Sequence, residues 1–346
     1  MYNRRLALLY RAGIGVFISL LLLAGTITTT TSAQQTSGGS GSTSTSGGTG
    51  GTSGGSGGST GGPATYGSEP GQVVVRLASS ADLAAVAQQY GLDPLPIDQF
   101  RSQPIYLLGI LDGSSPETKS SQLLSDNQKR ITYAEPNEVS QAPEGVGRVI
   151  WSGGGSVASY AVQWAGTTIR LDQAHAVSTG QGITVAVIDT GVDMTHPALA
   201  GRLVPGYDFV DQDNDPSEVG TVGVTPMYGH GTHVAGLVAL AAPGAMIMPI
   251  RALDPFGKGD TWVVAKAMAF AVDPDGDPNT KDGADIINLS MSTTTQSNLL
   301  RDVIRAVTCV NSDGGQGDLP CFQPGGRGAV VVTAAGNHSS STLEYP

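Results

Sequence analysis

Ile183-Thr184-Val185-Ala186-Val187-Ile188-Asp189-Thr190-Gly191 is the stretch of sequence that decides the fold. The apolar run at 183–188 is typical of a strand that is buried on both faces of a parallel sheet. Strand-like and helix-like segments then alternate, with strands at 245–253, 285–289 and 329–333 and helices at 230–242, 261–272 and 298–310. This alternation predicts an α/β fold, a doubly wound parallel sheet covered by helices on both faces.

Three polar residues follow predicted strands or begin a predicted helix, where sites form in such sheets. Asp189 ends the first strand, His230 begins a helix within Gly229–His233, and Asn337 follows the last strand within Thr333–Asn337. A buried carboxylate is costly unless it is paired, and a histidine N–H is a suitable partner whose tautomer it fixes. His230 then suits a general base, and the Asn337 amide suits a donor to a developing oxyanion.

His233 raises an alternative, because two histidines three residues apart on a helix could bind a metal. No third ligand is evident nearby and no H-E-x-x-H pattern occurs, so we expect His233 to be packed or hydrogen-bonded. Asp189, His230 and Asn337 could each also be structural, as turn caps or helix-start residues.

The ordered set Asp-Thr-Gly, His-Gly-Thr-His-Val-Ala-Gly and Ala-Ala-Gly-Asn closely resembles the subtilisin-like serine proteases, the subtilases or peptidase S8 family. The resemblance extends from about Gln163 to the end of the chain. It implies that Asp189 is the orienting acid, His230 the general base and acid, and Asn337 an oxyanion donor. It also implies a serine endopeptidase that hydrolyses proteins or peptides through an acyl-enzyme.

Two further segments resemble the substrate-binding strands of that family. Ser290-Met291-Ser292 stands where the family usually reads Ser-Leu-Gly, so Ser292 replaces a glycine at the specificity pocket. Gly257-Lys258-Gly259 resembles the opposite strand of the groove, and Ala334 and Gly336 are expected to contact substrate beside Asn337. The alternative for both segments is plain connecting loop.

The Gly-Thr-Ser-Met-Ala motif that carries the family nucleophile is absent from the 346 residues. The resemblance therefore predicts that the nucleophilic serine lies beyond residue 346, and that this chain alone does not hydrolyse peptides. The alternative function is a catalytically inactive pseudoprotease that binds peptides in the same groove.

The N-terminal third divides by composition. Residues 1–33 read as a secretory signal peptide, with Arg4, Arg5 and Arg11, an apolar run at 12–25 and a small-residue cleavage site at Thr31–Ala33. They predict a secreted, extracellular protein, and an uncleaved membrane anchor is the alternative. Residues 34–69 are a Gly/Ser/Thr-rich linker.

Residues 70–142 follow the pattern β-α-β-β-α-β of a small α+β, ferredoxin-like domain. The ending Tyr133–Asn137 resembles the end of the inhibitory I9-like propeptide of subtilases, which implies an intramolecular inhibitor. An unrelated small domain is the alternative. Residues 143–162 are expected to hold the processing site, and 163–346 to be a peptidase domain that is incomplete at its C-terminus.

The chain has 18 basic and 29 acidic side chains and a net charge of −11. This balance argues against nucleic acid or an anionic membrane surface as a partner. Asp208, Asp211 and Asp213 resemble a calcium loop of thermitase-like members, which implies a structural Ca²⁺ site; a solvated acidic loop is the alternative. Cys309 and Cys321, close together in a chain expected to be secreted, predict a disulfide.

Overall fold

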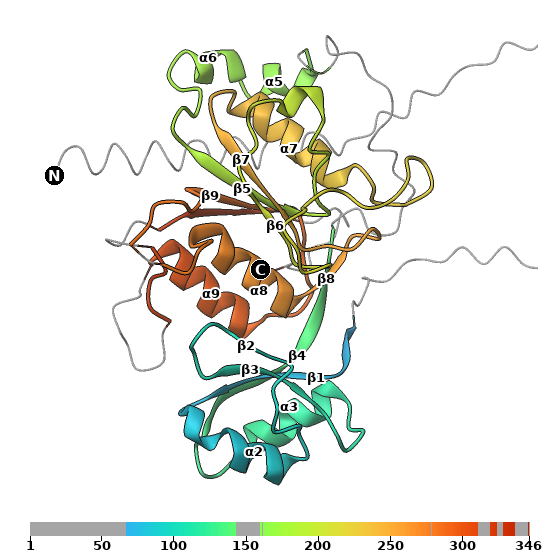
Figure 1. Cartoon of the computed structure of the whole chain (residues 1–346), viewed down its shortest axis with the longest axis vertical. Coiled ribbons are helices and arrows are strands. Elements are labelled where there is room, and N and C mark those ends of the chain that lie inside the picture. Colours follow the sequence, from blue (N-terminus) through green and yellow to red (C-terminus); the bar gives the residue numbers. More distant parts are fainter. Residues whose placement is uncertain are drawn as a thin grey trace, which may run out of the picture.

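A computed structural model of the chain describes residues 67–142, 160, 162–277, 279–310, 319–323, 328–335 and 345. The predicted signal peptide and most of the predicted linker and processing region lie outside the described residues. Two five-stranded sheets organise the described segments, one antiparallel and one parallel (Figure 1). None of the helices in these segments combines the length and apolar character needed to cross a bilayer.

The N-terminal unit forms most of the antiparallel sheet. Its elements are β1 (Ser68–Leu77), the 3-10 turn η1 (Ser80–Asp82), α2 (Leu83–Tyr90), β2 (Asp98–Gln99), β3 (Ile105–Gly109), α3 (Pro116–Leu124) and β4 (Ile131–Gln141). The strands lie in the order β2-β3-β1-β4, which confirms the predicted β-α-β-β-α-β pattern. Ser115 begins α3 by accepting a hydrogen bond from the Thr118 N–H, and Gly91 ends α2 with a φ of 65°.

The C-terminal unit carries the parallel sheet and its helices. Its elements are α5 (Trp164–Thr168), α6 (Leu171–His175), β5 (Thr184–Asp189), η2 (Pro197–Leu199), β6 (Tyr207–Asp208), α7 (His230–Ala241), β7 (Met246–Arg251), β8 (Lys258–Asp260), α8 (Thr261–Val272), β9 (Ile286–Leu289), α9 (Asn298–Thr308) and β10 (Val330–Thr333). The sheet order β10-β9-β5-β7-β6 puts β5 in the middle. After β5 the chain runs to the edge strand β6, returns to β7 beside β5, and then crosses to β9 and β10 on the other side of β5. Strands on both sides of β5 confirm the doubly wound α/β class and place a switch point at the end of β5.

Strand β5 is buried on both faces, as its apolar run predicts. Val185 and Val187 pack in a cluster with residues of α7. Ala186 and Ile188 pack in a second cluster with residues of α8 and α9. The sheet thus lies between α7 and the α8–α9 pair (Figure 1).

The N-terminal unit packs against the outer side of α8 and α9 (Figure 1). Phe100 and Tyr133 of this unit share one core cluster with Trp262 and Val303 of those helices. The rings of Phe100 and Trp262 meet edge to face, with centroids 5.9 Å apart. The two units are therefore joined through a continuous apolar core.

The predicted disulfide is confirmed, since Cys309 and Cys321 are bonded across a sequence separation of 12 residues. Cys309 ends α9 in the left-handed conformation, with a φ of 53°. The bridge fixes the end of this helix to the segment that precedes β10. A loop of this size is expected to stabilise the fold by about 3 kcal/mol.

Candidate active site

Asp189 and His230 meet at the carboxyl end of β5. The Asp189 Oδ1 atom lies 2.6 Å from His230 Nδ1, and both residues are almost fully buried, at 0% and 2% exposed. Asp189 Oδ1 also accepts a hydrogen bond from the Thr190 N–H at 2.7 Å. The carboxylate is therefore placed to hold a proton on Nδ1, which leaves Nε2 as the basic nitrogen.

The small residues around His230 allow the close approach of α7 to the end of β5. A Cβ on Gly231 would collide with the Gly191 carbonyl oxygen and lie 3.2 Å from the Asp189 Cβ. Gly191 itself has a φ of 100°, a backbone conformation that favours glycine. These two glycines explain why the helix can begin directly against the strand end.

Glu218 is a third titratable group beside the pair, and the sequence analysis did not identify it. Its Oε1 accepts hydrogen bonds from the Thr190 hydroxyl and the Thr232 N–H, and its Oε2 from the Gly229 N–H. Burial, and to a smaller degree the Asp189 charge, raise the pKa of Glu218 to about 7 against the effect of these hydrogen bonds. In the sequence, the feature that could have pointed to Glu218 is its position in the long connection between Asp189 and His230.

The two predicted substrate-binding strands hold the end of β4 between them. Gln141 exchanges two backbone hydrogen bonds with Ser292, each 2.9 Å long, and the Ala142 N–H donates to the Gly257 carbonyl. On the side of Gly257, β4 pairs with β8, so that Ser140 lies opposite Gly259. The end of the N-terminal unit thus lies in the predicted groove as an extended strand.

The remaining predicted groove residues lie in different settings. Met291 is buried in the core cluster beneath α8 and α9, Ser290 accepts a hydrogen bond from Asn288 Nδ2, and Lys258 is exposed. The Ala334 N–H donates to the Leu289 carbonyl at 3.1 Å, which places this residue beside β9. Gly336 and Asn337 lie outside the described residues.

One side chain of the N-terminal unit, Glu135, caps the start of α9. Glu135 Oε1 accepts hydrogen bonds from Ser297 Oγ and the Leu299 N–H, and Oε2 from the Asn298 N–H and Nδ2, all between 2.7 and 3.0 Å. A carboxylate is favoured at a helix N-terminus because it satisfies free N–H groups and opposes the helix dipole.

A buried ion pair joins the two units near this cap. Arg76 Nη1 lies 2.5 Å from Asp302 Oδ2, with both side chains less than a tenth exposed. Burial raises the pKa of Asp302, while the Arg76 charge lowers it. Residues 226 positions apart in the sequence are thereby paired, which no local pattern indicates.

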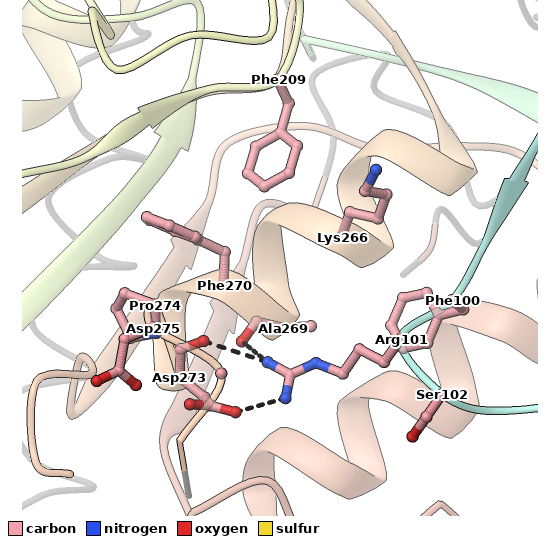
Figure 2. Close-up of a pocket in the computed structure, with 11 residues that line it drawn as sticks. Phe100, Arg101, Ser102, Phe209, Lys266, Ala269, Phe270, Asp273, Pro274 and Asp275 are labelled. Atoms are coloured by element: carbon pink, nitrogen blue, oxygen red, sulfur yellow. Dashed lines mark hydrogen bonds and ion pairs between the residues drawn. The ribbon is translucent and has the colours of Figure 1, made fainter.

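A pocket of about 520 Å³ opens where the two units meet (Figure 2), and its lining includes neither Asp189 nor His230. Phe100 and Arg101 line it from the N-terminal unit, and Phe209 and Phe270 from the C-terminal unit. Arg101 crosses the boundary and donates hydrogen bonds to Asp273 Oδ2 and to the Ala269 carbonyl. The polar contacts of this pocket therefore serve to join the units.

Two of the three predicted calcium residues contact an arginine. Asp208 and Asp211 each place an Oδ2 atom 2.5 Å from Arg251 Nη1, and Asp213 accepts a hydrogen bond from the Asp215 N–H. Among the described residues, no group of three or more histidine, cysteine or acidic side chains converges on a metal position. As arranged, these carboxylates fit Arg251 rather than a cation, and calcium binding stays a prediction.

An aspartate that orients a histidine, at the switch point of a doubly wound sheet, is two thirds of the arrangement known as a Ser-His-Asp triad. Residues 180–346 match a model described as the subtilase family. Residues 180–346, which carry the Asp189–His230 pair, are therefore similar to the subtilases.

Curated relatives show the same similarity. The chain is 33% identical over 232 residues to a thermophilic serine proteinase of Bacillus sp. (strain AK1), covering 64% of this chain and 48% of that protein. It is 32% identical over 194 residues to thermitase of Thermoactinomyces vulgaris, covering 53% and 58%. The chain thus spans about half the length of the curated relatives it matches.

A solved structure with the same fold is fervidolysin from Fervidobacterium pennivorans, described as a keratinolytic enzyme related to subtilisin. The similarity has a TM-score of 0.54 at 21% identity and covers 81% of this chain and 42% of that one. This likeness shows the fold alone.

Proposed function

We propose that this chain is part of the precursor of a secreted serine endopeptidase. The observation that carries the proposal is the buried Asp189–His230 hydrogen bond at the carboxyl edge of the sheet. An acid that fixes the tautomer of a histidine is the arrangement needed to activate a hydroxyl nucleophile. The names of the relatives, a serine proteinase and thermitase, support the same reaction class.

The proposed mechanism assigns one role to each residue. His230 Nε2 takes the proton from a serine hydroxyl as the serine attacks the peptide carbonyl, and later returns it to the leaving amine. Asp189 holds the proton on Nδ1 and stabilises the imidazolium that forms. The Asn337 amide donates to the oxyanion, an effect worth roughly 3 kcal/mol in subtilisin, the standard example of this contribution. The serine is expected beyond residue 346.

Residues 70–142 are proposed to act as the inhibitory propeptide. The support is the end of β4, which pairs with both predicted substrate-binding strands in the way an extended peptide substrate would. Cleavage is proposed within 143–162. Secretion is proposed from the predicted signal peptide. It is also supported by 43% identity over 122 residues to "Minor extracellular protease Vpr" of Bacillus subtilis, a match that covers 14% of that protein.

A peptidase assay tests the proposed activity. We expect the 346-residue chain to leave a protein substrate intact, and the protein extended by its natural downstream sequence to hydrolyse it after maturation. A serine-directed phosphonate should abolish that hydrolysis. An extended, folded protein that binds peptides without cleaving them would instead establish the alternative, a peptide-binding pseudoprotease.

Calcium binding at Asp208, Asp211 and Asp213 is proposed as a structural function. Asp211 is more than half exposed, so a cation would have to draw it away from Arg251. We expect saturating Ca²⁺ to raise the melting temperature by about 5 °C, and excess chelator to reverse the rise. The variant Asp213→Asn should show a smaller rise. Equal melting temperatures in Ca²⁺ and in chelator would contradict the proposal.

A further inference from the structure

Glu218 binds the backbone on both sides of His230. Its Oε2 accepts from the Gly229 N–H at 2.6 Å and its Oε1 from the Thr232 N–H at 3.0 Å. These are N–H groups at the N-terminus of α7, where a helix has no internal partners for its donors. The carboxylate therefore anchors the turn that carries the imidazole.

Thr190 extends this anchor to the end of β5. Its hydroxyl donates to Glu218 Oε1 at 3.2 Å and accepts from the Gly231 N–H at 3.0 Å, while its own N–H donates to Asp189 Oδ1. The His230 N–H donates to the Met227 carbonyl. Every backbone N–H from 229 to 232 thus has a partner, and three of the four are held directly or indirectly by Glu218.

The segment that carries Glu218 is itself fixed to the loop after β5. The Val192 N–H donates to the Pro216 carbonyl at 3.0 Å, and Val192 forms a parallel bridge with Ser217. A Cβ on Gly191 would lie 2.8 Å from the Pro216 carbonyl oxygen, so this packing is close. The backbone of the segment that carries Glu218 is therefore fixed as well, by its contacts with the loop after β5.

The charged and titratable groups on these elements are few. Asp189 and Asp193 lie on the β5 side, Asp215 and Tyr228 in the segment that carries Glu218, and His230 and His233 on α7. Asp189 raises the pKa of Glu218, so the charges of the two carboxylates are coupled. Asp189 contacts His230 directly. The charge of Glu218 therefore acts on the Asp189–His230 pair.

We propose that Glu218 is a positioning residue of the Asp189–His230 pair, which fixes the turn carrying the imidazole and holds its carboxylate charge close to that turn. This inference rests on the proposed function, because it assigns the role of a support to the predicted general base. Glu218 does not touch the reacting atoms; it acts through Thr190 and the first turn of α7.

The test is an NMR titration of the 346-residue chain labelled with ¹⁵N-histidine, which requires no enzymatic activity. The His230 signals are assigned by their loss in His230→Ala. We expect the imidazole shifts of His230 to follow two steps between pH 4 and 9, one of them near pH 7 where Glu218 ionises. A downfield Nδ1 proton should report the hydrogen bond to Asp189.

Three variants separate the positioning role from a purely structural one. Glu218→Gln should leave a single step, with its midpoint roughly 0.5 to 1 pH unit lower because a nearby negative charge is lost. Glu218→Asp keeps the ionisable group and should restore the second step. Glu69→Gln, the same chemical change in β1, should leave the curve unaltered. A purely structural Glu218 would lower the melting temperature in Glu218→Gln without changing the His230 curve.

The outcomes distinguish this inference from the proposed function. Suppose that the downfield proton is present and is lost in Asp189→Asn, but the wild-type curve has a single step that Glu218→Gln does not move. This result overturns the role of Glu218 and leaves the proposed function intact. Absence of that proton, with His230 shifts unaffected by Asp189→Asn, overturns both. If Glu218→Gln fails to fold, the wild-type and Glu218→Asp curves decide, because a single step in both contradicts the inference.

Discussion

Asp189→Asn is expected to reduce peptidase activity by about 10⁴-fold in the matured protein that carries the nucleophile, equivalent to about 5 kcal/mol of transition-state stabilisation. The asparagine amide has nearly the shape of the carboxylate, so the fold should persist. It cannot stabilise an imidazolium, and its N–H₂ group favours the wrong histidine tautomer. The 2.6 Å contact between Asp189 Oδ1 and His230 Nδ1 is the interaction that would be lost.

The measurement is kcat and kcat/KM on a peptide substrate, with circular dichroism to confirm folding. The effect should fall mainly on kcat, since the aspartate acts in the transition state rather than in substrate binding. Asp172→Asn, an exposed aspartate on α6, is the matched control and should retain full activity. More than a tenth of the wild-type activity in Asp189→Asn would contradict the assigned role.

Arg76→Met is expected to lower the free energy of unfolding by about 3 kcal/mol at pH 7. The substitution keeps an unbranched apolar stem but removes the guanidinium group, which leaves Asp302 without its partner in the boundary between the two units. Arg301 Nε, 3.9 Å from the other carboxylate oxygen, compensates only in part because its side chain is more than half exposed. Denaturant unfolding at constant pH measures the loss.

A double substitution and a pH series control this prediction. Arg76→Met with Asp302→Leu should recover most of the lost stability, since both buried charges are then removed. Burial raises the pKa of Asp302 in the folded state, and without Arg76 it rises further. The folded variant therefore binds more protons than the unfolded chain above about pH 4, so its deficit should grow as pH rises from 4 to 7. A deficit independent of pH and unrelieved by Asp302→Leu would mean that Arg76 acts through packing alone.

The inhibitory role proposed for the N-terminal unit would depend on two kinds of contact. Backbone pairing of β4 with β8 and Ser292 requires only an extended chain, and a substrate could replace it. The Glu135 cap on α9 and the Arg76–Asp302 pair lie outside the groove and depend on side chains of the N-terminal unit. These side-chain contacts add affinity that a substrate lacks.

The sequence alone determined the architecture and the first two site residues. Apolar runs that end in a polar residue marked β5 and Asp189, and a helix that begins at His230 followed from the small residues around it. These features are local, because strand and helix periods repeat over a few residues and parallel strands end at one edge of a sheet. Element ends differed by a few residues, as for α9, expected at 298–310 and observed at Asn298–Thr308.

Only the tertiary structure decided which distant polar groups support that site. Glu218 reaches α7 because the turn at Gly191 brings Pro216 beside the end of β5, and Glu135 reaches α9 across 163 residues. Asp208 and Asp211 contact Arg251 of β7, a partner 40 or more positions away that the sequence did not indicate. A charged side chain is paired by whichever opposite charge or donor the packed elements bring within about 3 Å, and sequence spacing does not encode that distance.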